Sequence, residues 1–214
     1  MLYRASDLDA IVLSSLEGND TLYTRTERFN AINEAIRIIN VHTGFLQTSV
    51  QMPRYSVAGR SIYRVPAGVL ILLRMEFEGR YLHPTGVGVL NHTYPEWMKE
   101  TTGSTQSPVA RWARWGITKV AIHPADSVGG QDMTFAGIAD PAPLVNDTDS
   151  VPMNDELADE ITDYASHILP LKEGGAIFAQ ASLYYQEFIR KRKRTARWKR
   201  MRWPAYFVET KVPE

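Results

Sequence analysis

Two groups of carboxylates have the residue types that metal-dependent hydrolysis requires. Glu76 and Glu78 lie two residues apart in a segment that alternates apolar and charged side chains, so they would share one face of a strand. A two-metal nuclease needs carboxylates that converge on a cleft beside a Lys, but no Lys or Arg occurs between Lys119 and Lys172. We therefore interpret the second group as a solvated or subunit-contacting helix face. Its members are Asp155, Glu156, Asp159, Glu160 and Asp163.

Other catalytic patterns are missing from the sequence. The five histidines have no metal-ligand spacing, the chain has no cysteine, and neither H-E-x-x-H nor G-x-S-x-G occurs. Residues 85–90 contain a Gly-Val-Gly sequence but lack the third glycine of a dinucleotide loop, so they predict an ordinary connection. We expect no catalytic residue, no cofactor and no metal, and hence no enzyme. A hydrolase that uses Glu76, Glu78 or the acids of 155–163 is a less favoured alternative.

The strongest feature is a basic segment, residues 190–202. It carries nine of the 24 Lys and Arg residues without one acid, whereas residues 1–189 carry 14 basic and 22 acidic side chains. The net charge of zero therefore conceals an acidic body with a cationic end, a distribution that favours association with a partner. The basic residues and their tryptophan neighbours are Arg190, Lys191, Arg192, Lys193, Arg194, Arg197, Trp198, Lys199, Arg200, Arg202 and Trp203.

Two functions compete for this segment. Basic and aromatic side chains neutralise phosphates and stack on bases, which gives salt-sensitive binding of nucleic acid. They also pair with an acidic partner protein, with a Trp as the buried anchor. The plainer interpretation, a basic helix end that complements its own dipole, needs fewer charges than nine. A short aromatic stretch, with Tyr206 and Phe207, follows Pro204 and could extend a sheet of another subunit.

The elements that must position these residues follow from periodicity and caps. A helix is predicted at 7–17, capped by Ser6, and another at 25–42, opened by a Thr24–Glu27 capping box and ended by Gly44. Further helices are predicted at 93–100, from 154 to the residue before Pro170, and at 176–198. Strands are predicted at 46–52, 61–65, 110–117, 119–123 and 133–139, with a hairpin over 73–82 and a linker at 140–151.

This order predicts an α+β fold, with N- and C-terminal helices packed as a bundle beside a central antiparallel β-sheet and an extended C-terminal arm. We expect a helical domain of residues 1–44 and 152–200, a β-rich domain of 45–140 and an arm of 201–214. The longest apolar run, Val69 to Leu73, is far shorter than the roughly 20 residues that cross a bilayer. The N-terminus lacks the apolar core of a signal peptide. A soluble, intracellularly made protein is expected.

The order of several motifs resembles that of the adaptor proteins (head–tail connector or head-completion proteins) of tailed bacteriophages, including tail tubular protein A. The resemblance covers roughly residues 25–189. It is carried by a Tyr94-Pro95-Glu96-Trp97 stretch, Trp112 and Trp115, residues 121–125 (Ala-Ile-His-Pro-Ala), the strand 134–139, Val151-Pro152 before an acidic helix, and Tyr184, Tyr185 and Phe188 in the last helix.

The resemblance implies a structural virion protein that forms a ring, twelve-fold in such proteins, docks on the portal and joins the capsid to the tail. Its implied partners are the portal protein, tail or nozzle proteins, further copies of the chain, and packaged DNA through non-specific contact, with no membrane. It would be assembled in the host cytoplasm and lie at the head–tail interface. Residues 190–203 with Tyr206 and Phe207 would contact portal or DNA, and the acids of 155–163 a neighbouring subunit. The alternative function is a nucleic-acid-binding protein that acts through its basic C-terminal helix.

Overall fold

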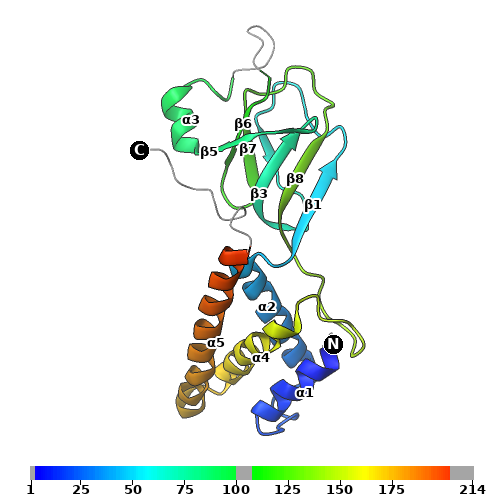
Figure 1. Cartoon of the computed structure of the whole chain (residues 1–214), viewed down its shortest axis with the longest axis vertical. Helices are drawn as coiled ribbons and strands as arrows, with labels where there is room; N and C mark the ends of the chain where they lie inside the picture. Colours follow the sequence, from blue (N-terminus) through cyan, green and yellow to red (C-terminus); the bar gives the residue numbers. More distant parts are fainter. Residues whose placement is uncertain (1–2, 100–107, 203–214) are drawn as a thin grey trace. The chain divides into compact units, whose positions relative to one another are not determined.

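A computed structural model describes residues 3–99 and 108–202, with side chains omitted at 175–180 and 196–202. The chain divides into two compact units, each described here by itself (Figure 1). The helical unit consists of residues 1–46 and 141–214, and the β unit of residues 47–140. The sequence-based domains, as independently folding parts of the chain, stay a prediction.

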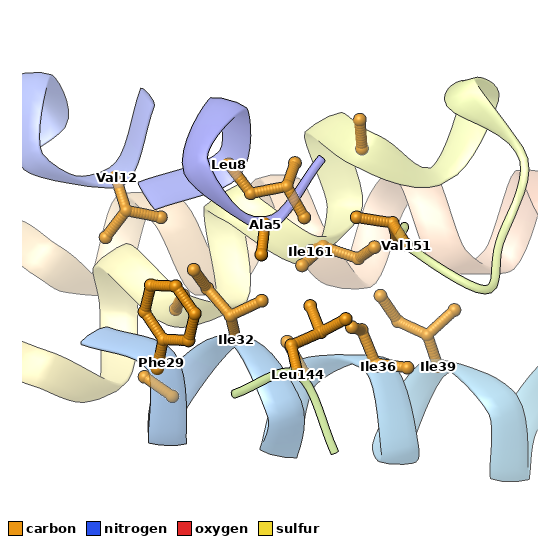
Figure 2. Close-up of a cluster of buried hydrophobic side chains, with 14 of the residues drawn as sticks. Ala5, Leu8, Val12, Phe29, Ile32, Ile36, Ile39, Leu144, Val151 and Ile161 are labelled. Carbon is orange, nitrogen blue, oxygen red and sulfur yellow. The ribbon is translucent and has the colours of Figure 1, made fainter. Parts of the chain in front are cut away.

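The helical unit contains α1 (Ala5–Ser15), α2 (Arg25–Thr43), a 3-10 turn η1 (Asp155–Leu157), α4 (Ala158–Ile168), a 3-10 turn η2 (Leu169–Lys172) and α5 (Gly175–Arg202). Ile32, Ile36 and Ile39 recur every three to four residues of α2, so they form one buried stripe. Leu8 of α1 and Ile161 of α4 face this stripe in one apolar cluster (Figure 2). Burial of each such side chain stabilises the fold by about 1.5–3 kcal/mol.

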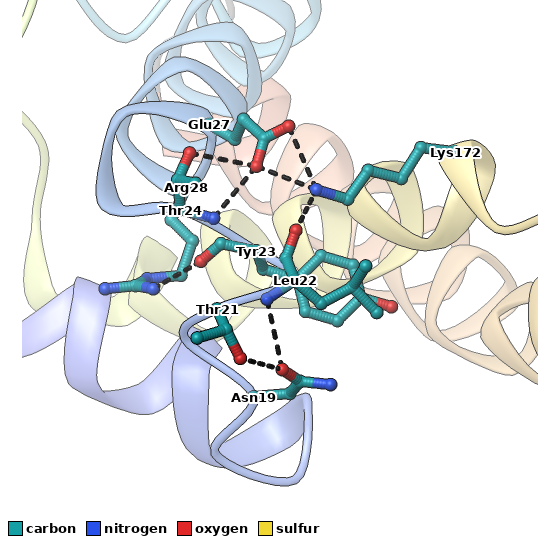
Figure 3. A network of polar contacts seen from close by, with 8 residues as sticks. All are labelled: Asn19, Thr21, Leu22, Tyr23, Thr24, Glu27, Arg28 and Lys172. Atoms are coloured by element: carbon teal, nitrogen blue, oxygen red, sulfur yellow. Dashed lines mark hydrogen bonds and ion pairs between the residues drawn. The ribbon is translucent and has the colours of Figure 1, made fainter.

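The start of α2 is fixed by the predicted capping box, and Lys172, 145 residues away in the sequence, also binds its Glu27 (Figure 3). The Glu27 carboxylate accepts hydrogen bonds from the Thr24 N–H at 2.8 Å and the Thr24 hydroxyl at 2.9 Å. Lys172 Nζ lies 2.8 Å from the same carboxylate and also donates to the Leu22 carbonyl. The hydrogen bond from Lys172, followed by those from Thr24, lowers the pKa of Glu27 to about 2. At its other end α2 stops at Gly44, whose φ of +57° lies in the left-handed region that favours glycine.

The segment predicted to be a linker, residues 140–151, is instead docked on the helices from Pro141 onward. Leu144 and Val151 are buried in the helical core. The Asn33 side chain exchanges hydrogen bonds with the backbone of Leu144, at 3.0 and 2.8 Å. Its Pro, Asn and Asp residues correctly indicated irregular backbone, but these contacts and backbone hydrogen bonds to Tyr3, Ala5 and Ser6 anchor that backbone to the helical unit.

The β unit contains two sheets within the described residues, where the sequence predicted one (Figure 1). The first has the order β1 (Gln47–Met52), β8 (Met133–Ala139), β3 (Val69–Phe77) and β4 (Arg80–Tyr81), all antiparallel. The second has the order β2 (Ile62–Arg64), β7 (Lys119–His123), β6 (Arg111–Arg114) and β5 (His83–Thr85). In it β5 runs parallel to β6, a pairing that three-residue strands give no periodicity to predict.

Apolar residues that alternate along the strands fill the space between the two sheets. Met75 and Phe135 of the first sheet join Tyr63, Val120 and Ile122 of the second in one buried cluster. Gly137 of β8 leaves room for a bulge in β3, because a Cβ at this position would collide with the Ile71 carbonyl. The sheets therefore form one core.

The predicted α+β fold, with helices at both ends of the chain and strands between them, is confirmed. Several local predictions were wrong. The helix expected at 93–100 lies earlier, as α3 (Val87–Thr93), because Gly86 starts it within the segment assigned to a loop. The first helix begins at Ala5, where the Arg4 N–H donates to the Asp7 carboxylate at 2.8 Å, and Ser6 is not its cap. The strand expected at 110–117 spans only 111–114.

No helix among residues 3–99 and 108–202 is long and apolar enough to span a bilayer.

Candidate docking surface of helices α4 and α5

The base of the basic segment is held by packing between α4 and α5. Phe188 of α5 is buried, and its ring centroid lies 5.0 Å from that of Tyr164 of α4. One turn earlier the Tyr184 hydroxyl donates to the Ser15 carbonyl at the end of α1, at 3.3 Å. The Tyr164 hydroxyl donates to Glu34 of α2 at 3.0 Å. Burial, followed by this contact with Glu34, raises the pKa of Tyr164 to about 12. These contacts fix α5 against α4 and α1, and α4 against α2.

One helical turn beyond Phe188, Lys191 pairs with acids of α4. Its ammonium lies 2.6 Å from the Asp163 carboxylate and 4.0 Å from that of Asp159. The side chains of Lys191 and Asp163 are only 22% and 17% exposed, so water screens this pair weakly. Burial raises the pKa of Asp163, and the hydrogen bond from Lys191 opposes that shift. Lys191 is thus paired within its own chain.

A second acid of α4, Glu160, is buried beneath the same part of α5. Its residue is 2% exposed, and its carboxylate accepts a hydrogen bond from the Thr195 hydroxyl. Burial raises the pKa of Glu160, and the Thr195 hydrogen bond, then Arg194 and Lys191, oppose the shift. Glu160 and Asp163, which the sequence assigned to a contact with another subunit, therefore lie against the basic helix of the same subunit. Both are turned toward α5 because residues three apart lie on the same face of a helix.

The other basic side chains with described positions differ in their partners. Arg190 forms a solvent-exposed pair with Glu187, one turn earlier on α5, at 2.5 Å. The Arg192 guanidinium lies 5.5 Å from the centroid of the Phe188 ring. Burial, with a smaller contribution from Arg192, lowers the pKa of His42 at the end of α2. Lys193 and Arg194 are exposed. Two cations of this segment are thus available to a partner, and Arg190 becomes available if its exposed pair with Glu187 opens.

Two of the remaining acids of the predicted contact face, Glu156 and Asp159, are exposed, although Asp159 also lies 4.0 Å from Lys191. The Asp159 side chain is 83% exposed, Glu156 is exposed, and Asp155 is half-buried at the start of η1. The five acids therefore separate into an inner pair that binds α5 and an outer group at the start of α4. Spacing alone placed all five on one helix, but did not distinguish the two sides.

The rest of the predicted docking residues are described only in part. Helix α5 continues to Arg202, beyond the predicted end near residue 198, so residues 201 and 202 belong to the helix and not to an extended arm. The side chains of Arg197, Trp198, Lys199, Arg200 and Arg202 are not described. Trp203, Tyr206 and Phe207 lie outside the described residues.

Two contact residues of this surface were missed from the sequence. Glu187 lies three residues before Arg190, a spacing that predicts a helical ion pair and could have been recognised. Thr195 gave no such signal, because its partner Glu160 is 35 residues away and the two meet only through helix packing.

The carboxylates considered for hydrolysis do not converge. Glu76 lies on β3 and pairs with Arg74 at 3.2 Å. Glu78 lies beyond the end of the strand, in the turn to β4, with a φ of +49°. The two therefore do not share a strand face. No group of three or more His, Asp or Glu side chains that could hold a metal ion occurs within the described part of the chain.

A comparison with protein families identified a match, whereas a comparison with curated proteins did not. A family model described as "SU10 adaptor protein" matches residues 4–206, a range that begins just before α1, crosses the β unit and ends beyond α5. The match thus covers both compact units and the whole basic segment. The chain belongs to the SU10 adaptor protein family, a family of bacteriophage structural adaptors.

Proposed function

We propose that the protein is a head-to-tail adaptor that assembles as a ring, docks on the portal through the end of α5, and joins the capsid to the tail. The family match supports the adaptor role. The observation that carries the docking assignment is the division of the basic segment. Phe188, Lys191 and Thr195 fix α5 to its own subunit, whereas Lys193 and Arg194 face outward from the same turns.

The proposed ring uses the same division, between charged residues that are paired within the subunit and charged residues that are exposed. A head-to-tail ring requires two different complementary surfaces on each subunit. The outer acids Glu156 and Asp159 remain exposed for such a contact, while Glu160 and Asp163 are used within the subunit. We propose that the ring lies at the head–tail interface of the virion and extends the channel for DNA.

Co-sedimentation with portal rings from the same genome tests this function. The full chain is compared with two truncations, one that ends at Thr195 and one that ends at Ile189. The first keeps Lys191 and Thr195, so its helical unit stays intact, whereas the second also loses the contacts with Asp163 and Glu160. Stoichiometric binding by the full chain, and its loss in the chain ending at Thr195 without a change in melting temperature, would support docking through the end of α5.

A charge reversal separates docking from folding. Lys193→Glu with Arg194→Glu changes two exposed positions and should weaken portal binding at least tenfold. Because Arg194 also acts on the buried Glu160, the melting temperature of this variant is measured beside its binding. Arg80→Glu with Arg54→Glu, at exposed positions of the β unit, makes the same change in net charge and serves as the control. Full portal binding by the chain ending at Thr195 and by the double reversal would contradict the proposal. Retention of duplex DNA by the full chain without portal binding would favour a nucleic-acid-binding protein instead.

A further inference from the structure

The β unit carries a second group of basic side chains, in a groove along the edge strand β2. The groove has a volume of about 570 Å³ and is open to solvent. Arg60, Arg64 and Lys119 supply three cations, and Ile62 and Met98 contribute apolar surface. No pattern in the sequence indicated this site, because its residues come from three separate segments.

The cations of this groove are not neutralised by the surrounding structure. Arg64 of β2 and Lys119 of β7 are direct partners across the antiparallel ladder, and both are exposed. Like charges in that position destabilise a sheet. In residues 3–99 and 108–202 neither they nor Arg60 forms an ion pair with an acid. Like charges that cost stability and form no ion pair within the described residues are the pattern expected of a surface that meets an anionic partner.

The backbone of β2 selects for hydrogen-bond acceptors. Ser61 and Val65 bond to β7, so the alternating residues Ile62 and Arg64 direct their N–H and C=O groups away from it. Both outward carbonyls are already occupied: Arg60 Nε donates to that of Ile62 at 2.8 Å, and the Tyr55 hydroxyl to that of Arg64 at 3.2 Å. An added β-strand needs both donors and acceptors along the edge. Among the described residues the outward carbonyls are thus partly used, whereas the N–H groups of Ile62 and Arg64 are not, so this edge suits carboxylates better than another strand.

The position of Arg60 is fixed before any partner arrives. The Tyr63 hydroxyl donates to the Arg60 carbonyl at 2.9 Å and accepts from the Val57 N–H at 3.1 Å. The Arg60 guanidinium also lies 5.4 Å from the centroid of the Tyr63 ring, which is buried. A cation held in this way loses little conformational freedom on binding.

From these observations we infer that the groove binds carboxylates of a second copy of this chain, those of Glu156 and Asp159 at the start of α4. The inference rests on the proposed ring and identifies one of its contacts. Charge complementarity carries the choice of partner. Residues 1–46 and 141–189 carry 5 basic and 15 acidic side chains, whereas residues 47–140 carry 9 basic and 7 acidic. With its basic segment included, the helical unit carries 15 basic and 17 acidic side chains, so the β unit is attracted to the acidic part before residue 190, where Glu156 and Asp159 lie. A contact of this kind is heterologous and propagates around a ring.

Complementary charge reversal in the full-length protein tests the contact. One variant reverses the groove (Arg64→Glu with Lys119→Glu), and another reverses the outer acids (Glu156→Lys with Asp159→Lys). Each should weaken self-association at least tenfold in sedimentation velocity, with portal rings present as the template. An equimolar mixture should restore assembly, because each reversed surface then meets an opposite charge on the other variant. A chain with all four changes should also assemble.

Matched controls make every outcome decisive. Arg54→Glu with Arg80→Glu changes the charge of the β unit equally outside the groove, and Glu17→Lys with Glu173→Lys, at exposed positions, does so in the helical unit. Neutral Arg64→Gln with Lys119→Gln, which avoids any new repulsion, should weaken assembly less than the reversal does. If wild type forms rings on the portal and the groove variants do so equally well, the inference is wrong and the proposed function stands. If wild type forms no ring with or without portal, the proposed function fails first.

A phosphate partner would give a different result. Groove variants that assemble normally but lose binding to a 30-base-pair duplex would assign the groove to DNA and overturn the inference.

Discussion

The basic segment of α5 and the groove of β2 are both rich in cations, but among the described residues only the first has a cation that is paired with a largely buried acid of its own chain. Lys191 is half-buried against Asp163, and Thr195 binds the buried Glu160. Arg64 and Lys119 instead face each other in solvent. The comparison teaches that the number of charges does not identify a binding surface. A charge that the fold compensates serves stability, whereas one that the fold leaves uncompensated, at a cost, is available for a partner.

The largest loss in the free energy of unfolding is expected from replacing Arg28, a buried arginine of the helical unit that is paired with an acid. Arg28, 5% exposed, donates to both carboxylate oxygens of Asp9, at 2.6 and 2.8 Å, and to the Tyr23 carbonyl. Arg28→Met keeps most of the side-chain volume but leaves Asp9 without its cation, and should reduce the free energy of unfolding by about 3–5 kcal/mol. Urea denaturation followed by circular dichroism measures this. Arg25→Met, which breaks the exposed pair with Asp147, is the control and should cost less than about 1 kcal/mol.

A smaller loss is expected at the base of the basic segment. Lys191→Met leaves Asp163 partly buried without its ammonium partner, and should lower the unfolding free energy by about 1–3 kcal/mol. Lys193→Met, at an exposed position two residues away, should change it by less than about 0.5 kcal/mol. Equal effects of the two substitutions in the same denaturation experiment would show that Lys191 is not a structural charge.

The pH dependence of stability distinguishes a buried acid from an exposed one. Because burial raises the pKa of Glu160 in the folded state, the fold holds this proton more tightly than the unfolded chain does. Stability from this group is full below its unfolded pKa and is lost as pH rises through the higher folded pKa. Glu160→Gln keeps an acceptor for Thr195 without a charge to bury, so it should stabilise the protein by about 1 kcal/mol at pH 7. Melting curves from pH 4 to 8 should show a gain that grows with pH; a loss at pH 7 would contradict this assignment.

The smallest expected change is a gain in the free energy of unfolding, from a substitution in the groove. Arg64→Glu replaces a like-charge pair with an opposite-charge pair across from Lys119, and should raise the unfolding free energy by about 0.2–1 kcal/mol. The same substitution is expected to impair assembly, so stability and association should change in opposite directions. Denaturation of the isolated protein, beside sedimentation with portal rings, measures both. A loss of stability would mean that Arg64 is structural.

Local signals predicted much of the fold. The Thr24–Glu27 box and Gly44 marked the ends of α2 to within one residue, and alternation located β1 and the second half of β3. Failures occurred where the local pattern was short. The three-residue strand β5 has no measurable period, and α3 begins at a glycine in a segment that resembled a loop. Leu144 and Val151 were missed as core residues because their neighbours have the composition of a linker.

The sequence by itself determined that the chain is α+β, that its charge is concentrated at residues 190–202, and that this end suits a partner. These properties depend on residue type and short-range periodicity, which can be obtained directly from the sequence. Only the tertiary structure decided which charges are used internally. Glu160 meets Thr195, Asp163 meets Lys191, and Arg64 meets Lys119, because helices and strands that are 28 to 55 residues apart pack or pair side by side. Contacts at such separations arise from burial of the apolar faces between the elements. The positions of the charged residues in the sequence therefore do not predict them.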